Sequence, residues 1–500
     1  MEGRPALLPH QKHAPVHLGR VLILGLGKSG MAAFRYCSAL LGGRVEGITV
    51  AGGDASEQSL TFAQANALPG VEFYFDTTEV AGHFGLCIAS PGISQFCDFY
   101  QNAARASEEL ISELEFAWRE SAAESIWVAV TGTNGKSTTT ALIAHLLASS
   151  GIKAIACGNI GDACSDVLRE GRADIYVAEV SSYQLASTLL FAPQIAVLLN
   201  ISPDHLSWHK SHEAYVAAKM KVFENLGQVE GGTAILDATD EAARHIVKGF
   251  KACSRDTRGF DYIPLGAALG LACNMVEQCG AENGAYLRDG QMWLSLQGQD
   301  HCFGPTEGLQ IRGRHNVHNA LAAAVAAAVL GLDEACITQA LAGFTALEHR
   351  IEPCGSVAGV ACYNDSKATN SDATIKALSS FGSLPLIVLL GGRDKGCDLE
   401  ALVCEARRHC KAIVCFGEVG PRILEAFVSP FWAAFDAGDL ACLSAEGLED
   451  AFEAALGTAR AGDVILLSPA CASFDEFDNF EHRGRVFKDL VARRAGQRGA

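Results

Sequence analysis

Residues 126–147, IWVAVTGTNGKSTTTALIAHLL, carry the strongest chemical signal in the chain. An apolar run leads into a glycine-containing turn, after which the pattern predicts a helix that begins near Lys136. A turn of this kind directs backbone N–H groups at a phosphate, the helix N-terminus adds positive potential, and Lys136 can reach the terminal phosphates. The usual spacing needs glycine where the chain has Val130, so Gly132 is the first glycine of a shortened variant. The segment indicates a nucleotide phosphate site rather than an ordinary tight turn.

A second glycine-rich turn, GLGKSG, spans residues 25–30 and also stands between an expected strand and an expected helix. Three interpretations stay open: a dinucleotide site of an oxidoreductase, a site for another diphosphate such as a nucleotide sugar, or close packing of helix on strand. Dinucleotide-binding proteins place an acidic residue about 20 positions further on. Here Glu46 comes early and Asp54 late, so the motif alone does not decide.

Polar residues follow the next strands of the middle region. Glu179 ends the run IYVAEV, and the run IAVLLN leads to Asp204 and His205. Because the carboxyl ends of parallel strands share one edge of a sheet, we expect these side chains near the phosphate loop, where a carboxylate suits Mg²⁺. Each residue alone would more simply be a helix cap or a structural histidine. Lys219, beside Lys221 in an expected helix, is not selected by any pattern.

Three polar loops follow three expected strands in the last third of the chain. Each loop by itself would be a capped turn, but three at consecutive strand ends indicate a ligand site. The loops are YNDSKATN at 363–370, GGRDKG at 391–396 and LLSPACASFDEFDNFEHRGRVF at 466–487.

Parallel sheets must position these loops, because short β-branched runs alternate with Ala- and Leu-rich helical stretches along the chain. The alternation predicts an α/β protein, and it resets near residues 107–113 and 345–350. An Asp-Gly pair within residues 285–296 predicts an antiparallel hairpin in the middle series. The expected strands are 20–25, 45–50, 71–75 and 86–89; 126–131, 152–157, 175–180, 195–200 and 233–236; and 360–364, 385–390, 412–416 and 464–468.

Composition restricts the class of protein. The 500 residues are 49% hydrophobic and 19% charged, which excludes general disorder and gives a prior of about three domains. A net charge of −18 excludes the broad basic surface that nucleic acids need. The longest apolar run, 320–332, is too short for a membrane span of ~20 residues and is expected to be a buried helix.

The N-terminus and the cysteines indicate the cellular compartment in which we expect the protein. The first twenty residues lack the apolar segment of a secretion signal and are expected to form a loose lead-in. The 18 cysteines include no CxxC pair for zinc or redox chemistry, so we expect reduced thiols that behave as small hydrophobic side chains. Together these features predict a soluble cytoplasmic protein.

The motifs as a set resemble those of the Mur ligases, a family shared with the folylpolyglutamate synthases. The resemblance runs from about residue 21 to residue 491. It implies a Rossmann-like UDP-sugar-binding domain at 1–110, with 1–19 as a loose extension, a central P-loop ATPase-like domain with a mixed sheet at 111–346, and a Rossmann-like amino-acid-binding domain at 347–500. The motifs that carry it are GLGKSG, SPGI, GTNGKST, EVSSYQL, SPDHL, AAK, GRHNVHNALAA, EHRIE, NDSKATN and SPACASFDEFDNFEHRG.

The resemblance implies ligands for each site. GLGKSG would hold the diphosphate of a UDP-sugar rather than a nicotinamide cofactor. The family has Asp-Thr-Arg near the uracil where this chain has AGGDAS, which makes Asp54 the candidate there. The implied UDP-sugar residues are Gly25, Gly27, Lys28, Ser29, Gly30 and Asn159. The implied ATP residues are Gly132, Thr133, Asn134, Gly135, Lys136, Ser137, Thr138, Asn316, Asn319, Arg350 and Asp365.

The resemblance also implies two Mg²⁺ ions and an amino-acid pocket. Lys219 would carry a carbamate formed from CO₂, which converts a cation into a hard oxygen ligand. The first ion would be held by Ser137, Thr138 and Glu179, and the second by His205 and Lys219. The implied pocket comprises Lys367, Thr369, Lys395, Ser473, Phe480 and Phe474, the last at a position where most relatives have leucine.

The implied reaction is ATP-dependent addition of D-glutamate to UDP-N-acetylmuramoyl-L-alanine through an acyl phosphate, a step of peptidoglycan precursor synthesis. Lys136, His205 and Lys219 would be the catalytic residues. The expected partners are these small molecules, with no nucleic acid and no membrane insertion, and the expected state is a monomer. The alternatives are a sibling Mur ligase, a folylpolyglutamate synthase-like ligase, a nicotinamide-dependent oxidoreductase and a non-catalytic nucleotide-binding scaffold.

Overall fold

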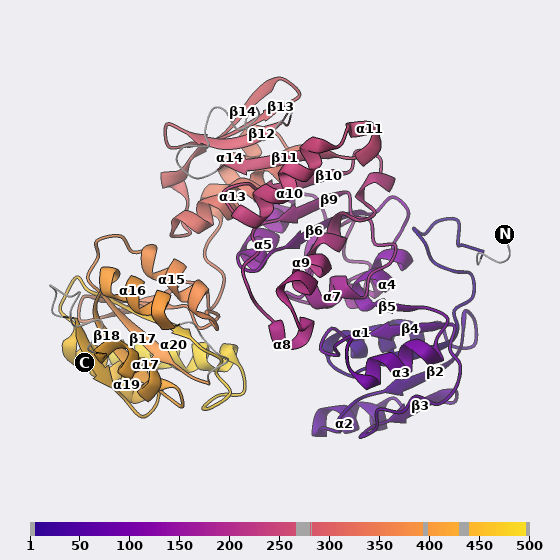
Figure 1. Cartoon of the computed structure of the whole chain (residues 1–500), viewed down its shortest axis with the longest axis horizontal. Coiled ribbons are helices and arrows are strands. Elements are labelled where there is room, and N and C mark those ends of the chain that lie inside the picture. The colour runs from indigo at the N-terminus through magenta and orange to yellow at the C-terminus, as the bar shows by residue number, and fades with distance from the viewer. Residues whose placement is uncertain (1–5, 267–280, 282, 394–398, 430–439, 497–500) are drawn as a thin grey trace. The chain divides into compact units, whose positions relative to one another are not determined.

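A computed structural model describes residues 6–266, 281, 283–393, 399–429 and 440–496. The chain forms two compact units, Met1–Gly308 with His318–Ala342, and Leu309–Val317 with Gly343–Ala500. The first unit contains two sheets and the second contains one (Figure 1). The predicted α/β class is therefore confirmed, whereas the predicted domain borders near residues 110 and 346 stay predictions.

The first sheet has five parallel strands in the order β3-β2-β1-β4-β5. Its register pairs Leu24 with Ala51 and with Ala89, so the loops after three strands meet at one edge. The strands are β1 Gly19–Leu24, β2 Val45–Ala51, β3 Val71–Tyr74, β4 Leu86–Ala89 and β5 Leu110–Ser112. The accompanying helices are α1 Lys28–Ser38, α2 Glu57–Ala65, α3 Asp98–Ala106 and α4 Glu113–Glu120.

The second sheet has nine strands in the order β14-β13-β12-β11-β10-β9-β6-β8-β7, and the pairs from β7 to β12 are parallel. Val130 on β6 pairs with Glu179 on β8, which puts that carboxylate beside the start of the phosphate loop. The strands are β6 Ile126–Thr131, β7 Ala154–Gly158, β8 Ile175–Glu179, β9 Ile195–Leu198, β10 Thr233–Asp237, β11 Asp261–Gly266, β12 Gly284–Arg288, β13 Gln291–Leu296 and β14 Gln299–Pro305.

Helices connect the parallel strands of this sheet. The apolar run at 320–332 lies largely in α13, whose side chains from Ala320 to Ala327 are buried, as predicted. The helices are α5 Lys136–Ser149, α6 Cys164–Arg169, α7 Ser182–Ala186, α8 Leu206–His209, α9 His212–Met220, α10 Glu241–Ala252, α11 Arg255–Arg258, α13 Arg314–Val329 and α14 Glu334–Gly343, with 3₁₀ turns η1 Lys221–Phe223, η2 Leu226–Gln228 and η3 Thr306–Gly308.

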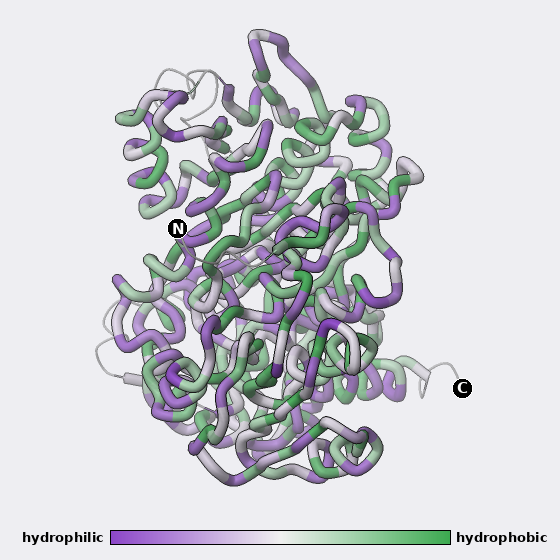
Figure 2. Tube along the Cα trace, turned by 90° about the vertical axis from the view of Figure 1, so that its right-hand side faces the viewer, coloured by the Kyte–Doolittle hydropathy of each residue, from purple (hydrophilic) through white to green (hydrophobic). Residues whose placement is uncertain are grey.

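The predicted hairpin is present. Strands β12 and β13 pair antiparallel around Asp289 and Gly290, whose φ values of 52° and 72° are those of a type I′ turn. Strand β14, which the pattern did not predict, extends the hairpin to the edge of the sheet. In Figure 2 apolar and polar stretches alternate along the trace, as expected for elements that each bury one face.

The second unit contains a six-stranded sheet in the order β15-β16-β20-β17-β18-β19, in which only the edge strand β15 is antiparallel among the described pairs. Strand β15 escaped prediction because Pro353 and Gly355 interrupt its pattern. The strands are β15 Glu352–Val357, β16 Val360–Asn364, β17 Leu386–Gly391, β18 Cys410–Phe416, β19 Ala441–Ser444 and β20 Val464–Ala470. The helices are α15 Ser371–Ser379, α16 Leu399–His409, α17 Gly420–Val428, α19 Leu448–Thr458 and α20 Phe480–Gly496.

The prediction of a loose N-terminal lead-in is wrong for residues 6–18. The N–H of Lys12 donates to Ser121 and that of His13 to Arg119, and Ala14 is fully buried. The stretch is held because its backbone finds partners at the end of α4 and directly after it, a contact that a local sequence pattern cannot reveal. No helix in the described part of the chain is both long and apolar enough to cross a membrane.

Candidate active site

The loop between β6 and α5 has the geometry of a phosphate-binding turn. Gly135 lies immediately before the helix with φ of 86°, a conformation that glycine adopts without strain. A Cβ at this position would lie 2.4 Å from Oδ1 of Asn319, so any side chain here would collide. The Lys136 ammonium folds back over the loop and donates to the carbonyl of Thr133 at 2.9 Å. The 14-residue helix therefore presents its N-terminal N–H groups and a lysine at one open turn.

Glu179 connects this loop to the neighbouring strand. Its carboxylate is buried and accepts one hydrogen bond from the Ser137 hydroxyl at 2.6 Å and another from the side-chain amide of Asn159 at 2.8 Å. Thr138 is buried in the first turn of α5 beside Ser137. The structure thus brings together the predicted carboxylate, the Ser137 hydroxyl and the predicted substrate-loop amide, with Thr138 as the next residue of the helix.

Lys219 lies in the last turn of α9 and is 2% exposed. Its ammonium donates to the carbonyl of Gly132 at 2.7 Å and lies 4.7 Å from the centre of the Tyr215 ring. Burial, and next the positive charge of Lys136, hold the pKa of Lys219 well below its ordinary value. A lowered pKa favours the neutral amine, which is the form that reacts with CO₂.

His205 lies at the same edge of the sheet but remains exposed. It precedes α8 with φ of 55°, in the left-handed region, and its Nε2 lies 3.4 Å from a carboxylate oxygen of Asp204. The Tyr183 ring packs against the imidazole with centroids 4.8 Å apart. The side chain is therefore accessible to a ligand and braced by an aromatic ring.

Three residues that the sequence reasoning missed support this site. Asn200 accepts from the backbone N–H of Asn134 at 2.8 Å, and the Tyr215 hydroxyl lies 2.9 Å from that of Thr133, so both fix the phosphate loop. His209 is fully buried and its Nε2 lies 2.9 Å from the Ser182 hydroxyl. Burial lowers the pKa of His209 to about 4. The position of Asn200 just after β9 could have indicated that it lies near the phosphate loop. The sequence around Tyr215 and His209 gave no such indication.

A pocket of about 770 Å³ opens at the carboxyl edge of the first sheet. It brings the GLGKSG turn together with Asp54, the SPGIS segment at 90–94 and the loop that carries Asn159. The Ser90 hydroxyl donates to the carbonyl of Gly25 at 2.9 Å, and Lys28 donates to the carbonyl of Gly161. Of the six UDP-sugar residues that the resemblance implied, the pocket is lined by Gly25, Gly27, Lys28, Ser29 and Asn159.

Gly30 acts differently from the other glycines of this turn. A Cβ on Gly30 would lie 2.0 Å from the carbonyl oxygen of Gly25, so the close approach of α1 to β1 requires glycine. Gly30 therefore shapes the turn rather than lining the pocket.

Two of the predicted ATP residues lie on α13. Asn319 accepts from the Thr139 hydroxyl at 3.2 Å, which places its amide against the first turns of α5. Asn316 lies in the first turn of α13 and donates to the carbonyl of Arg312 at 2.6 Å.

In the second unit, Asp365 is buried at the end of β16. Its carboxylate accepts from the Ser468 hydroxyl at 2.7 Å and from the backbone N–H of Ile351 at 3.2 Å. Burial raises the pKa of Asp365 to about 7, against the opposing effects of the Ser468 hydrogen bond and the positive charge of Arg350. Arg350 is therefore close enough to Asp365 to interact with it electrostatically.

The remaining predicted residues that the structure describes in this unit lie on the loops after β16 and β20 and at the start of α20. The Lys367 ammonium lies 3.7 Å from the centre of the Phe480 ring, a cation–π contact. The Ser473 hydroxyl is buried without a hydrogen-bond partner among the described residues, whereas Phe474 is 55% exposed. Thr369 follows Lys367 on the same loop, and its backbone N–H donates to the Lys367 carbonyl. Lys395 lies outside the described residues.

The first unit therefore holds two adjoining sites. One is a phosphate loop beside a carboxylate and an amine whose pKa is lowered, and the other is the pocket of about 770 Å³ at the GLGKSG turn. Asn159 belongs to both, since it lines the pocket and donates to Glu179. Such an arrangement can bring a nucleoside triphosphate to a group at the end of a second ligand.

Two family models match the chain. They are described as Mur ligase middle domain, over residues 130–327, and Mur ligase, glutamate ligase domain, over residues 349–471. A protein of Salinibacter ruber named UDP-N-acetylmuramoylalanine--D-glutamate ligase is 37% identical over 482 residues, or 94% of this chain and 97% of that protein. A protein of the same name from Thermoanaerobacter pseudethanolicus is 34% identical over 478 residues, or 95% and 98% of the two chains.

Solved structures share the fold at low sequence identity. The UDP-N-acetylmuramate-alanine ligase MurC of Thermotoga maritima matches with a TM-score of 0.54 and 17% identity, over 95% of this chain and all of that one. FolC of E. coli, solved with DHPP and ADP, matches with a TM-score of 0.52 and 16% identity, over 74% of this chain and 89% of that one. These likenesses concern the fold alone.

Proposed function

Because this chain belongs to the Mur ligase family, we propose that it is an ATP-dependent ligase that joins D-glutamate to UDP-N-acetylmuramoyl-L-alanine. The observation that carries the choice of substrates is the 34–37% identity to ligases of that name over 94% or more of the chain. The reaction would belong to peptidoglycan precursor synthesis, with ADP and phosphate as the other products. We also propose a cytoplasmic monomer, as expected from the sequence.

The phosphate loop would bind ATP. Residues 132–138 would hold the phosphates, mainly by the backbone N–H groups at the start of α5, because those of Thr133 and Asn134 donate to Asn200. The Lys136 ammonium would leave the Thr133 carbonyl for the transferring phosphoryl group, whose charge it would stabilise. Asn319 contacts α5 directly and would hold the nucleotide from that side, together with Asn316. Arg350 and Asp365 would contact ATP from the second unit.

The donor set fits magnesium. Glu179 and Ser137 offer a carboxylate and a hydroxyl 2.6 Å apart, both buried and both hard oxygen donors, and Thr138 adds a second hydroxyl. When bound, Mg²⁺ would neutralise charge on the phosphate oxygens. We propose a second ion at His205 and Lys219, with Lys219 carbamylated by CO₂. The support for carbamylation is the burial and lowered pKa of its amine.

The pocket at the edge of the first sheet would bind the UDP-sugar. Gly25 and its neighbours would approach the diphosphate by their backbone, while Lys28 would add positive charge and Asn159 would orient the ligand beside Glu179. Asp54 lines the same pocket and would lie toward the uracil. D-glutamate would bind in the second unit, at Lys367, Thr369, Ser473, Phe474 and Phe480, with Lys395 as a further proposed contact.

The chemistry would proceed in two steps. The alanyl carboxylate attacks the γ-phosphorus of ATP, the bond to ADP breaks, and an acyl phosphate forms. The amine of D-glutamate then attacks the acyl carbon, phosphate leaves, and the nitrogen loses a proton. Lys136 would hold the transferring phosphoryl group, and His205 would stabilise charge that develops near the acyl group.

A phosphate-release assay with amino-acid panels tests the proposal. With ATP, Mg²⁺ and UDP-N-acetylmuramoyl-L-alanine, D-glutamate should release phosphate, whereas L-alanine, meso-diaminopimelate and dipeptides should not. Carboxyl-labelled ¹⁸O should appear in the released phosphate, because the acyl phosphate transfers one substrate oxygen. Release with a different acceptor would identify a sibling ligase instead. Release without label would exclude the acyl phosphate.

A further inference from the structure

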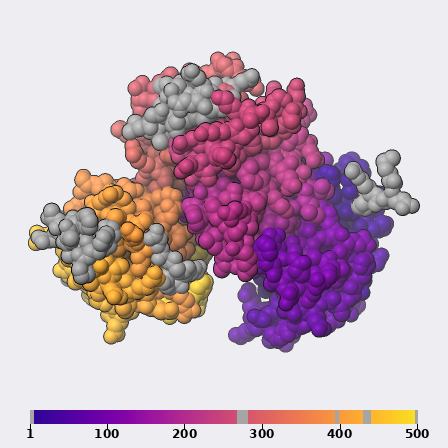
Figure 3. All heavy atoms as spheres, in the orientation of Figure 1, coloured from indigo at the N-terminus to yellow at the C-terminus, as the bar shows by residue number. Residues whose placement is uncertain are grey.

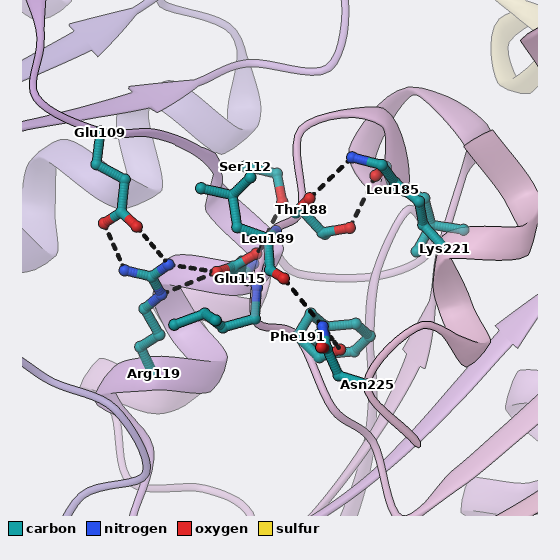
Figure 4. Close-up of polar contacts among 11 residues, drawn as sticks. Glu109, Ser112, Glu115, Arg119, Leu185, Thr188, Leu189, Phe191, Lys221 and Asn225 are labelled. Carbon is teal, nitrogen blue, oxygen red and sulfur yellow. Dashed lines mark hydrogen bonds and ion pairs between the residues drawn. The ribbon is translucent and has the colours of Figure 1, made fainter. Parts of the chain in front are cut away.

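Residues 186–191 run from the last residue of helix α7, which follows Glu179, toward strand β9, which begins at Ile195 and leads toward His205. We call this stretch the connecting loop. Figure 4 shows that its backbone is hydrogen-bonded from two directions, by side chains near α4 and by side chains that follow α9. A loop so fully bound cannot shift without breaking several contacts at once.

Glu115 of α4 binds the connecting loop on one side. Its side chain is fully buried, and its carboxylate accepts from the backbone N–H groups of Leu189 and Leu190, the latter at 2.9 Å. Arg119 also donates to Glu115 and forms a two-bond pair with Glu109, at 2.6 and 2.9 Å (Figure 4). In the space-filling view the indigo-to-purple and magenta parts of the first unit meet in continuous contact (Figure 3).

Lys221 and Asn225 bind the loop on the other side. The Lys221 ammonium donates to the carbonyls of Ala186 and Thr188, both at 2.9 Å. The Asn225 amide donates to the carbonyls of Leu189 at 2.9 Å and Phe191 at 3.4 Å. Lys221 thereby supplies positive charge to the last carbonyl of helix α7, where the helix dipole favours a cation.

Lys221 immediately follows helix α9, whose last turn carries Lys219. The two lysines are two residues apart, so a shift of this end of the helix moves both ammonium groups. Lys219 reaches the phosphate loop through one hydrogen bond, to the Gly132 carbonyl, whereas Lys221 has two bonds to a loop that Glu115 holds in place. The contacts of Lys221 are therefore the stronger anchor for this end of α9.

We propose that Lys221, assisted by Asn225, is a positioning residue that holds the Lys219 amine against the phosphate loop. This inference rests on the proposed function in one respect, namely that Lys219 takes part in the reaction. Because a displacement of about 1 Å at a reacting group can lower a rate ~100-fold, Lys221→Met should lower kcat by about 10- to 100-fold. KM for the UDP-sugar should change by less than about threefold, because the pocket at residues 25–30 is not held by Lys221.

The test compares Lys221→Met, Lys221→Arg and the control Lys248→Met, whose lysine is exposed on α10. Besides kcat and KM, it measures the rate of reductive methylation of Lys219 in the ligand-free full-length protein by mass spectrometry. Lys219 is 2% exposed and should label slowly in the wild type. Labelling should quicken about tenfold or more in Lys221→Met, and Lys221→Arg should restore much of both readouts, since a guanidinium can also donate to two carbonyls.

Unchanged kcat and unchanged Lys219 labelling in Lys221→Met would overturn the inference. A fall in kcat with unchanged labelling would also overturn it, because Lys219 would then still be held in place and the rate would have fallen for another reason. If Lys221→Met does not fold, Asn225→Ala carries the same expectations; it removes the bonds to two loop carbonyls and one accepted from the Gln228 amide. If the wild type forms no product with D-glutamate, the proposed function fails while the labelling experiment still tests the positioning role.

Discussion

The substitution Lys219→Met separates two roles of the buried lysine. If the amine only supports the phosphate loop, its loss removes one hydrogen bond, of 2.7 Å to the Gly132 carbonyl, worth ~1 kcal/mol or about a fivefold change. If it carries a carbamate that helps to hold Mg²⁺ near the transferring phosphoryl group, the loss should cost ~10²–10³ in kcat, the usual size of a preorganised electrostatic contribution. We expect the larger value, measured as initial rates of phosphate release at saturating ATP and D-glutamate.

Stability and chemical rescue complete this test. Methionine has a side chain of similar length to lysine but no ionisable amine. Because the cost of burying that amine is removed, the melting temperature of Lys219→Met should not fall. Lys219→Ala should regain part of its activity when a short carboxylic acid is added, because the acid can replace the carbamate in the space that alanine leaves. A loss of tenfold or less in Lys219→Met, or no response of Lys219→Ala to the acid, would refute the carbamate role. Lys248→Met serves as the control and should behave as the wild type.

Three further predictions concern the phosphate loop and the second unit. Lys136→Ala should remove several kcal/mol of transition-state stabilisation, measured as a fall in kcat/KM. Near-normal turnover would contradict the role assigned to Lys136. Gly135→Ala should destabilise the protein by ~1–2 kcal/mol in denaturant titrations and weaken ATP binding, because φ is 86° and the new Cβ would lie 2.4 Å from the Asn319 amide oxygen; a stable, ATP-binding variant would contradict this. The pKa of Asp365 is raised to about 7, so its protonated form stabilises the fold at low pH and this contribution is lost as pH rises toward and through 7. Asp365→Asn should therefore gain stability relative to the wild type between pH 4 and pH 8 in thermal melts, and a difference that is constant across this range would contradict the assignment.

The sequence predicted the local parts of the candidate site well. Gly132 to Thr138 are contiguous, and a strand, a glycine turn and a helix suffice to specify their backbone, so the predicted turn is present. The Asp289–Gly290 hairpin is another local feature, and it was predicted for the same reason. The family resemblance was confirmed by relatives that match nearly the full chain.

Features that depend on distant partners were missed or misjudged. Residues 6–18 carry no strong pattern, yet their backbone is hydrogen-bonded to the end of α4 and to the residues that follow it. Strand β15 contains proline and glycine and is tolerated because it lies at an edge. Tyr215 and His209 gave no local signal, because their partners, Thr133 and Ser182, lie 82 and 27 residues away.

The amino-acid sequence alone determined the alternation of strands and helices, the turns that need glycine, and the edge on which the polar loops gather, since each depends on near neighbours and on the direction of parallel strands. Only the tertiary structure decided which of many lysines is buried. The lowered pKa of Lys219 arises from surroundings contributed by several segments of the chain and from the charge of Lys136. Desolvation depends on everything that excludes water from a group, so no local pattern could have singled out Lys219 over Lys221.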